Sequence, residues 1–410
     1  MNDKYSKKNQ DFSLSLHLPF NLTDLCALYI VCWAIIPAMS RGNIFRIFAI
    51  ICSIEFILYG FLSGKFNRGK IDNYFFLAIL MITILLGHNI LGNGNLAIAR
   101  SINLFVSVII SMIAQYYYNF NIRKLKKITI IIILIYILEI IPSLIAVAKN
   151  PYVLRNAAGE HVRAGIEAFA GSYGYVYGCV LLVTFFVYDL HKNKKKLLKK
   201  MLQLFAIISL CYLILKSGFT TALILTIIGI ISALCIGKNE LKTLIFTIIV
   251  FIFLSYIIPL FLHYIVENLD IPIIYKSKIL YLNELFASNQ NVTYGDSTRG
   301  KLLNKGFTTI LKYPILGSVI FSGVEEAGGH QEIVDVMANY GIIYAILFYY
   351  IILGTPYRLL KLDKPLQLLY LIIIVLLGMT NTIDYATLSV ALFVGTNISL
   401  SSRKIKKRRR

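Results

Sequence analysis

The most informative shortage in this chain is of acidic residues. Asp and Glu together number 20 in 410 residues, against 41 Lys and Arg, and charged residues make up only 15% of the chain. Soluble globular domains carry about 25% charged residues, so this composition excludes an ordinary soluble domain. The 58% apolar content excludes intrinsic disorder, and 26 Gly with 9 Pro in 410 residues exclude a collagen-like repeat.

Cysteine is also scarce, and its placement excludes a disulfide-stapled scaffold. None of the six cysteines forms a CxxC pair or stands near a histidine at metal-ligand spacing, and all lie in apolar stretches: Cys26, Cys32, Cys52, Cys179, Cys211 and Cys235. A cleavable signal peptide is lacking as well, because the first apolar run starts near Leu25 after a polar leader without a small-residue cleavage site. We expect that first run to be its own insertion signal.

Long apolar runs are what the chain has in abundance. A helix needs about 20 apolar residues to cross a ~30 Å hydrocarbon core. Twelve runs approach this length, at 23–41, 44–64, 71–91, 97–119, 127–148, 168–189, 201–217, 219–237, 242–266, 332–354, 366–383 and 385–401. The sequence therefore predicts an all-α polytopic membrane protein with about 12 transmembrane helices and one large outer loop between the ninth and the tenth.

The basic residues predict how these helices are oriented. With both chain ends in the cytoplasm, 28 of the 41 Lys and Arg fall at inner ends of helices, as the positive-inside rule requires. The predicted parts are a cytoplasmic leader (1–22), helices one to nine (23–266), the large extracytoplasmic loop (267–331), helices ten to twelve (332–401) and a basic cytoplasmic tail (402–410). This tail is typical of a topology anchor on anionic lipid, so no nucleic-acid partner is expected.

Several basic residues remain for the outer loops, the side that the rule disfavours. They are Lys149, Arg155, Arg163, Lys276, Lys278, Arg299, Lys301, Lys305 and Lys312. Guanidinium groups grip phosphate oxygens bidentately, so a lipid-linked pyrophosphate is one ligand that this set would suit. Contact with lipid headgroups, or simple solvation, explains the same charges equally well, and both interpretations stay open.

Polar residues next to the predicted tenth helix form a second group of candidates. His330 follows two glycines where the large loop returns to the membrane, and an imidazole there can take a proton from an attacking hydroxyl. Glu332 and Asp335 follow closely enough to orient His330 or to cap the helix. Other charged residues lie within or beside predicted helices: Arg46, Glu55, Arg100, Glu139, Lys216 and Asp384. Because of Glu55 and Glu139, a transporter with a proton or ion path also stays open. No metal-binding constellation is evident.

The stretch from Ser297 to Tyr349 resembles the signature region of the bacterial O-antigen ligase and polymerase superfamily. The resembling elements are Ser297 and Arg299 as Ser-x-Arg, Pro314 and Gly317 as Pro-x-x-Gly, and then His330 and Gly341. Upstream, the Arg163 to Gly178 segment and the KSGFTTAL sequence at Lys216 resemble two further motifs, although here Lys216 precedes Ser217 where the family has Arg after Ser. The motifs cover about a third of the chain.

The resemblance implies a metal-independent, cofactor-free glycosyltransferase in the cytoplasmic membrane, with its active site on the extracytoplasmic face. It would polymerise O-antigen or capsular repeat units, moving glycan from undecaprenyl pyrophosphate to a sugar hydroxyl of the next unit. Arg299 would hold the pyrophosphate and His330 would be the acceptor base, with Arg163, Lys216 and Asp335 binding substrate. The expected partners are the lipid-linked oligosaccharide, membrane lipid, and a chain-length regulator and a flippase of the same pathway.

Other functions remain open at this point. An O-antigen ligase that transfers finished glycan to another acceptor shares the donor chemistry and the motifs. A lipid-linked oligosaccharide flippase would also be a basic polytopic protein of this length, although the long loop and the His330 region count against it. A lipid-phosphate-sugar glycosyltransferase needs a carboxylate in its first outer loop, and the segment from Arg41 to Asn43 contains none.

Overall fold

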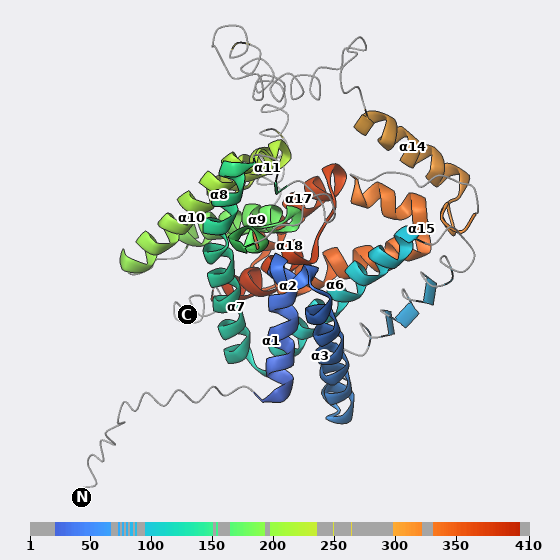
Figure 1. Ribbon diagram of the computed structural model, residues 1–410, viewed down its shortest axis with the longest axis horizontal. Helices are drawn as coiled ribbons and strands as arrows, with labels where there is room; N and C mark the ends of the chain where they lie inside the picture. Colours follow the sequence, from blue (N-terminus) through green and yellow to red (C-terminus); the bar gives the residue numbers. More distant parts are fainter. Residues whose placement is uncertain are drawn as a thin grey trace, which may run out of the picture.

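The computed structural model describes residues 21–66, 95–150, 165–192, 197–235, 298–321 and 331–401, together with a few isolated positions between them. These residues are helical, with no strand among them (Figure 1). The prediction of an all-α protein is thus confirmed for the described part of the chain. The predicted helices at 71–91 and 242–266 and most of the predicted loop 267–331 lie outside it.

The helices follow the predicted apolar runs. The first half of the chain forms α1 (Leu22–Ile35), α2 (Pro37–Arg41), α3 (Asn43–Leu62), α6 (Asn95–Phe120), α7 (Ile122–Leu138), α8 (Ile140–Lys149), the short 3-10 helix η1 (Gly165–Phe169) and α9 (Tyr173–Lys192). The second half forms α10 (Leu197–Ser217), α11 (Thr220–Cys235), α14 (Thr298–Lys312), α15 (Glu332–Tyr349), α16 (Thr355–Leu359), α17 (Lys364–Thr380) and α18 (Tyr385–Ser389), with π-helical turns η2 (Tyr350–Gly354) and η3 (Val390–Gly395).

Five helical stretches are long and apolar enough to cross a membrane. They are Asn43–Leu62, Ile122–Lys149, Tyr173–Lys192, Leu197–Ser217 and Glu332–Leu359. Shorter apolar helices run over Leu22–Ile35, Thr221–Cys235, Lys364–Thr380 and Tyr385–Ser401. The chain is therefore compatible with a membrane-embedded helical protein, as its composition predicted.

The exposed surface of α3 is suited to hydrocarbon rather than to water. Only 22% of its most apolar window is buried inside the protein. Its outward side is a row of large apolar residues: Ile44, Ile47, Ile51, Ile54, Leu58 and Leu62. Such a continuous apolar face would promote aggregation in water, whereas hydrocarbon is its natural surrounding.

At the other extreme, α9 is the central helix, with 83% of its apolar window buried. It packs against α10, α11, α17 and α18, and glycines permit this close approach. A Cβ at Gly178 would lie 2.0 Å from the Tyr136 hydroxyl, and one at Gly229 of α11 would lie 2.1 Å from Thr184 Oγ1. Small residues at helix contacts let membrane helices pack closely where no hydrophobic effect draws them together.

Three predicted spans are interrupted in the structure. The run 23–41 divides into α1 and α2 at Ile36, whose ψ of 113° is extended because the following residue is Pro37. The run 127–148 divides into α7 and α8 at Glu139, and α15 is broken at Gly341, where φ is 78°. Apolar length alone does not reveal these breaks, although Pro37 is a sequence signal for the first of them.

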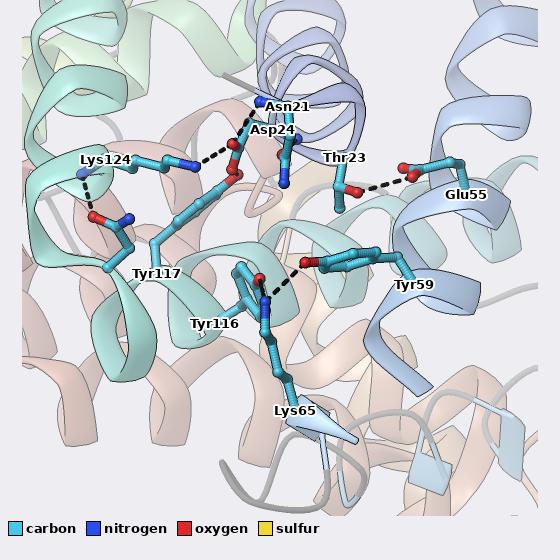
Figure 2. Close-up of polar contacts among 10 residues, drawn as sticks. Asn21, Thr23, Asp24, Glu55, Tyr59, Lys65, Tyr116, Tyr117 and Lys124 are labelled. Atoms are coloured by element: carbon cyan, nitrogen blue, oxygen red, sulfur yellow. Dashed lines mark hydrogen bonds and ion pairs between the residues drawn. The ribbon is translucent and has the colours of Figure 1, made fainter. Parts of the chain in front are cut away.

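Polar contacts join the N-terminal ends of α1 and α7 to the C-terminal ends of α3 and α6 (Figure 2). Asp24 accepts hydrogen bonds from the Tyr117 hydroxyl at 2.7 Å and from the Lys124 ammonium, and Thr23 donates to Glu55 at 2.9 Å. Lys65 donates to the hydroxyls of Tyr59 at 2.8 Å and of Tyr116 at 3.2 Å. These contacts fix four helix ends relative to one another.

A second buried ion pair fixes the C-terminal end of α9 to the start of α17. The Lys192 ammonium lies 2.7 and 2.8 Å from the two carboxylate oxygens of Asp363, and the Tyr188 hydroxyl donates to the same carboxylate at 2.6 Å. The Asp363 side chain is fully buried, so it needs both donors to offset the loss of water.

Candidate functional site

A cavity of about 160 Å³ lies where the first turns of α15 meet the turn between α17 and α18. We call it the Glu332–Asp384 pocket after its two carboxylates. It is lined by Ser107, Glu332, Val336, Tyr340, Tyr344, Phe348, Thr382, Ile383, Asp384 and Tyr385. Half of these residues come from α15, three before its break at Gly341 and two after it, so both parts of α15 contribute to one wall of the cavity.

The turn between α17 and α18 forms the opposite wall, and its polar residues hold it in place. Helix α17 ends at Asn381, whose side-chain amide donates to the Tyr177 hydroxyl of α9 at 2.8 Å. The Asn381 carbonyl accepts a weak hydrogen bond of 3.4 Å from the Glu332 amide. The turn is thereby attached both to the central helix and to the start of α15.

Asp384 is the N-cap residue of α18, where its carboxylate accepts from the Ala386 amide at 3.4 Å. It lies directly against α9, since a Cβ at Gly174 would come within 2.0 Å of an Asp384 carboxylate oxygen. The neighbouring Thr387 hydroxyl donates to the Gly174 carbonyl at 3.1 Å. Only glycine leaves room for the carboxylate at this contact.

This environment changes the acidity of Asp384. The turn lies outside the spanning helices. Desolvation there raises the pKa of Asp384 from its ordinary value to about 6, although hydrogen bonds from the Ala386 and Tyr385 amides lower this pKa. A carboxyl group with a pKa near 6 is ionised at neutral pH and yet is a stronger base than an exposed aspartate.

Aromatic side chains make up much of the remaining wall. Tyr340 and Tyr344 lie with ring centroids 4.9 Å apart, and Tyr385 stacks on Trp33 of α1 at 6.3 Å with an interplanar angle of 16°. The pocket thus combines two carboxylates with several aromatic rings. Carboxylates accept hydrogen bonds from hydroxyl groups, and ring faces bury apolar surface, a combination that suits a polyhydroxylated ligand such as a sugar.

Of the five site residues predicted from the sequence, the structure describes the side chains of two, Asp335 and Lys216. Asp335 is on α15 with 1% of its surface exposed, and it accepts a 2.9 Å hydrogen bond from the Gln331 amide. This is the helix-capping alternative that the sequence left open, and Asp335 does not line the pocket. Lys216 is exposed at the end of α10, with its ammonium 5.7 Å from the centre of the Tyr212 ring, and it does not line the pocket either.

The other three predicted residues are not described at the side-chain level. Arg299 is the second residue of α14, and only its backbone is described. His330 and Arg163 lie outside the described residues. His330 stands two positions before Glu332 in the sequence.

The segment around Lys216 nevertheless reaches the pocket indirectly. Gly218 has a φ of 66° and ends α10, and the next residue, Phe219, packs edge-on against Tyr173 at 5.4 Å and near Tyr177 at 6.1 Å. Tyr177 is the residue that accepts the hydrogen bond from Asn381. The KSGF sequence therefore supports the α17–α18 turn through α9.

Of the ten lining residues, only Glu332 was given a role from the sequence. Asp384 was only one of several charges near predicted helices, and Tyr385 was one of 27 tyrosines. The available signal was the polar NTID sequence, residues 381–384, between two apolar runs. It marks a turn, but it does not indicate that the turn faces α15.

Among the described residues, no group of three or more His, Cys, Asp or Glu side chains is arranged to hold a metal ion. A search against protein-family models finds no match to this chain, and neither does a search of curated proteins.

Proposed function

We propose that this protein is a polymerase of lipid-linked oligosaccharide repeat units. It transfers glycan from undecaprenyl pyrophosphate to a sugar hydroxyl of the next unit, and the Glu332–Asp384 pocket binds the acceptor sugar. The observation that carries the proposal is the position of this pocket. Half of its lining comes from α15, which lies within the Ser297–Tyr349 stretch that resembles the O-antigen ligase and polymerase superfamily.

The chemistry divides between two groups of residues. A new bond forms between the acceptor oxygen and the anomeric carbon of the donor while the bond from that carbon to the pyrophosphate breaks. Pyrophosphate is a good leaving group and needs positive charge, which we assign to Arg299 with Arg163 and Lys216. The acceptor proton passes to His330, two residues from Glu332. The carboxylates of Glu332 and Asp384 accept hydrogen bonds from other acceptor hydroxyls.

The proposal includes the 12-helix topology, with both chain ends in the cytoplasm of the cell and the enzyme in its cytoplasmic membrane. The positive-inside pattern supports this topology. The positions of the polar contacts that join helix ends also support it. Lys65, Lys124 and Lys192 all belong to ends assigned to the cytoplasm, whereas the Glu332–Asp384 pocket belongs to ends assigned to the other face.

The surface glycan profile of cells whose own copy carries Asp384→Asn or Glu332→Gln tests the pocket. We expect each change to reduce long chains by about tenfold or more, since each removes an acceptor contact worth roughly 1.5–3 kcal/mol. The matched control is Glu167→Gln, which changes a half-buried carboxylate away from the pocket that is paired with the exposed Lys149. Normal chain lengths in both pocket variants, at equal membrane levels of protein, would refute the assignment.

His330→Ala separates the candidate functions. Loss of long chains with single repeat units still reaching their final acceptor supports the polymerase. Long chains that persist on the lipid carrier indicate a ligase. An unchanged profile removes His330 from the mechanism and favours the flippase.

A further inference from the structure

Helix α14 has a surface that the proposed function does not use. One side packs against α15 at Gly306, where a Cβ would lie 2.7 Å from Val334 Cγ1. The outward side carries large apolar side chains, with Phe307 exposed by 48% and Leu311 by 83%. Figure 1 shows α14 at the periphery of the helices, beside α15.

The residues of α14 separate into rows on its surface. Leu303, Phe307 and Leu311 are spaced four apart and form an apolar row. A second row, spaced four, three and four apart, contains Lys301, Lys305, Thr308 and Lys312. The helix carries four basic residues and no acidic one, Arg299 being the fourth. An apolar row beside a basic row is the pattern of a helix that lies in a membrane interface.

The apolar row continues onto a membrane-spanning helix. After α14 the chain exposes Ile315 and Leu316, and the Ile342 amide of α15 donates to the Pro314 carbonyl at 2.9 Å. Beyond this contact α15 exposes Ile342, Ile343 and Ile346, within the stretch Glu332–Leu359 that can cross a bilayer. The end of α14 therefore lies at the boundary of a lipid-facing surface.

We propose that α14 lies flat in the headgroup region of the bilayer, with its apolar row toward the acyl chains and its lysines toward anionic lipid. Two observations favour lipid over a protein partner. The apolar row is continuous with the surface of a spanning helix, and the three lysines of α14, with no acidic residue on the helix, complement anionic headgroups. Interfacial helices bury their apolar face about 5–10 Å deep.

Tryptophan fluorescence of the full chain in phosphatidylglycerol–phosphatidylcholine vesicles tests this arrangement. Leu311→Trp places the probe in the apolar row, and Lys312→Trp, about 100° further round the helix, places it in the basic row as the matched control. Both positions are exposed on the protein, and the signal of the buried native Trp33 is subtracted using the wild-type protein. Lipids brominated on the upper part of the acyl chains should quench the probe at 311 about twofold more than the probe at 312.

Equal quenching at the two positions, or none at 311, would overturn the proposal. If quenching at 311 is weak at high protein density and rises when lipid is added tenfold at constant protein, a second copy of the chain covers the row, and the lipid assignment is wrong. Should Leu311→Trp not fold, Phe307→Trp probes the same row. None of these readouts measures glycan transfer, so the result is independent of the proposed function.

Discussion

At the scale of single residues, carboxylates in two kinds of environment serve different purposes. Asp24 and Asp363 are paired with lysines and tyrosine hydroxyls at helix ends, so their charges are compensated and fix the helices relative to one another. Asp384 instead accepts a weak backbone hydrogen bond and lines a cavity, and no cation among the described residues pairs with it. A carboxylate in such a position is typical of a binding site.

The raised pKa of Asp384 makes a prediction about stability. Between its ordinary value of 3.8 and about 6, the unfolded chain loses the proton while the folded protein keeps it, so folding stability falls as pH rises through this range. We expect this loss to be roughly 1–3 kcal/mol in the wild type and absent in Asp384→Asn. Thermal unfolding in detergent at pH 4 to 7 measures it.

The difference in Tm between wild type and Asp384→Asn should therefore shrink by about 2–6 °C from pH 4 to pH 6 and then stay constant. Parallel curves for the two proteins over the whole range would show that Asp384 has an ordinary pKa.

At the scale of secondary-structure elements, α15 and the segment after α14 are held together through two glycines. The Ser318 and Val319 amides donate to the Ala338 and Asn339 carbonyls at 3.0 and 3.1 Å. Gly317 and Gly341 both have positive φ, of 74° and 78°. The two backbones lie so close that an added Cβ would meet a carbonyl oxygen at 2.2 Å or less in either case. These contacts fix the break in α15 that shapes the pocket wall.

Gly341→Ala should therefore destabilise the protein by about 3 kcal/mol or more, because the alanine meets both left-handed strain and the Ile315 carbonyl. Gly64→Ala is the matched control. Gly64 has a similar φ of 63° but nothing within 4 Å of its added Cβ, so only the strain of about 1 kcal/mol applies. Thermal unfolding in detergent compares the two. Equal losses would mean that the α14–α15 contact adjusts freely.

At the scale of the whole molecule, the distribution of polar contacts fits the proposed orientation in the membrane. The buried ion pairs lie at ends of helices that the positive-inside rule assigns to the cytoplasm. The carboxylates of the pocket lie at the opposite ends, at the start of α15 and in the α17–α18 turn. A bilayer tolerates such polar groups best near its two surfaces, where water can solvate them in part.

Cysteine labelling tests this orientation in a background without the six native cysteines. Phe169→Cys in η1 should react with a membrane-impermeant thiol reagent in intact cells, and so should Asn291→Cys in the predicted loop. Leu198→Cys at the start of α10 should react only after permeabilisation. Phe169 and Leu198 are exposed by 52% and 72%, so access within the protein does not limit either reaction. The reverse pattern would invert the topology.

The sequence by itself determined the all-α class, the membrane character and the ranges of most helices, because apolar length and charge along the chain are local properties. It also indicated that Gly317 and Gly341 matter, but not that they meet. Only the tertiary structure decided where α15 breaks, that Asp335 caps this helix, and that Ser107, Glu332 and Asp384 line one cavity. These features depend on distances between segments far apart in the sequence, and uniform apolar runs carry no information about which of their faces meet.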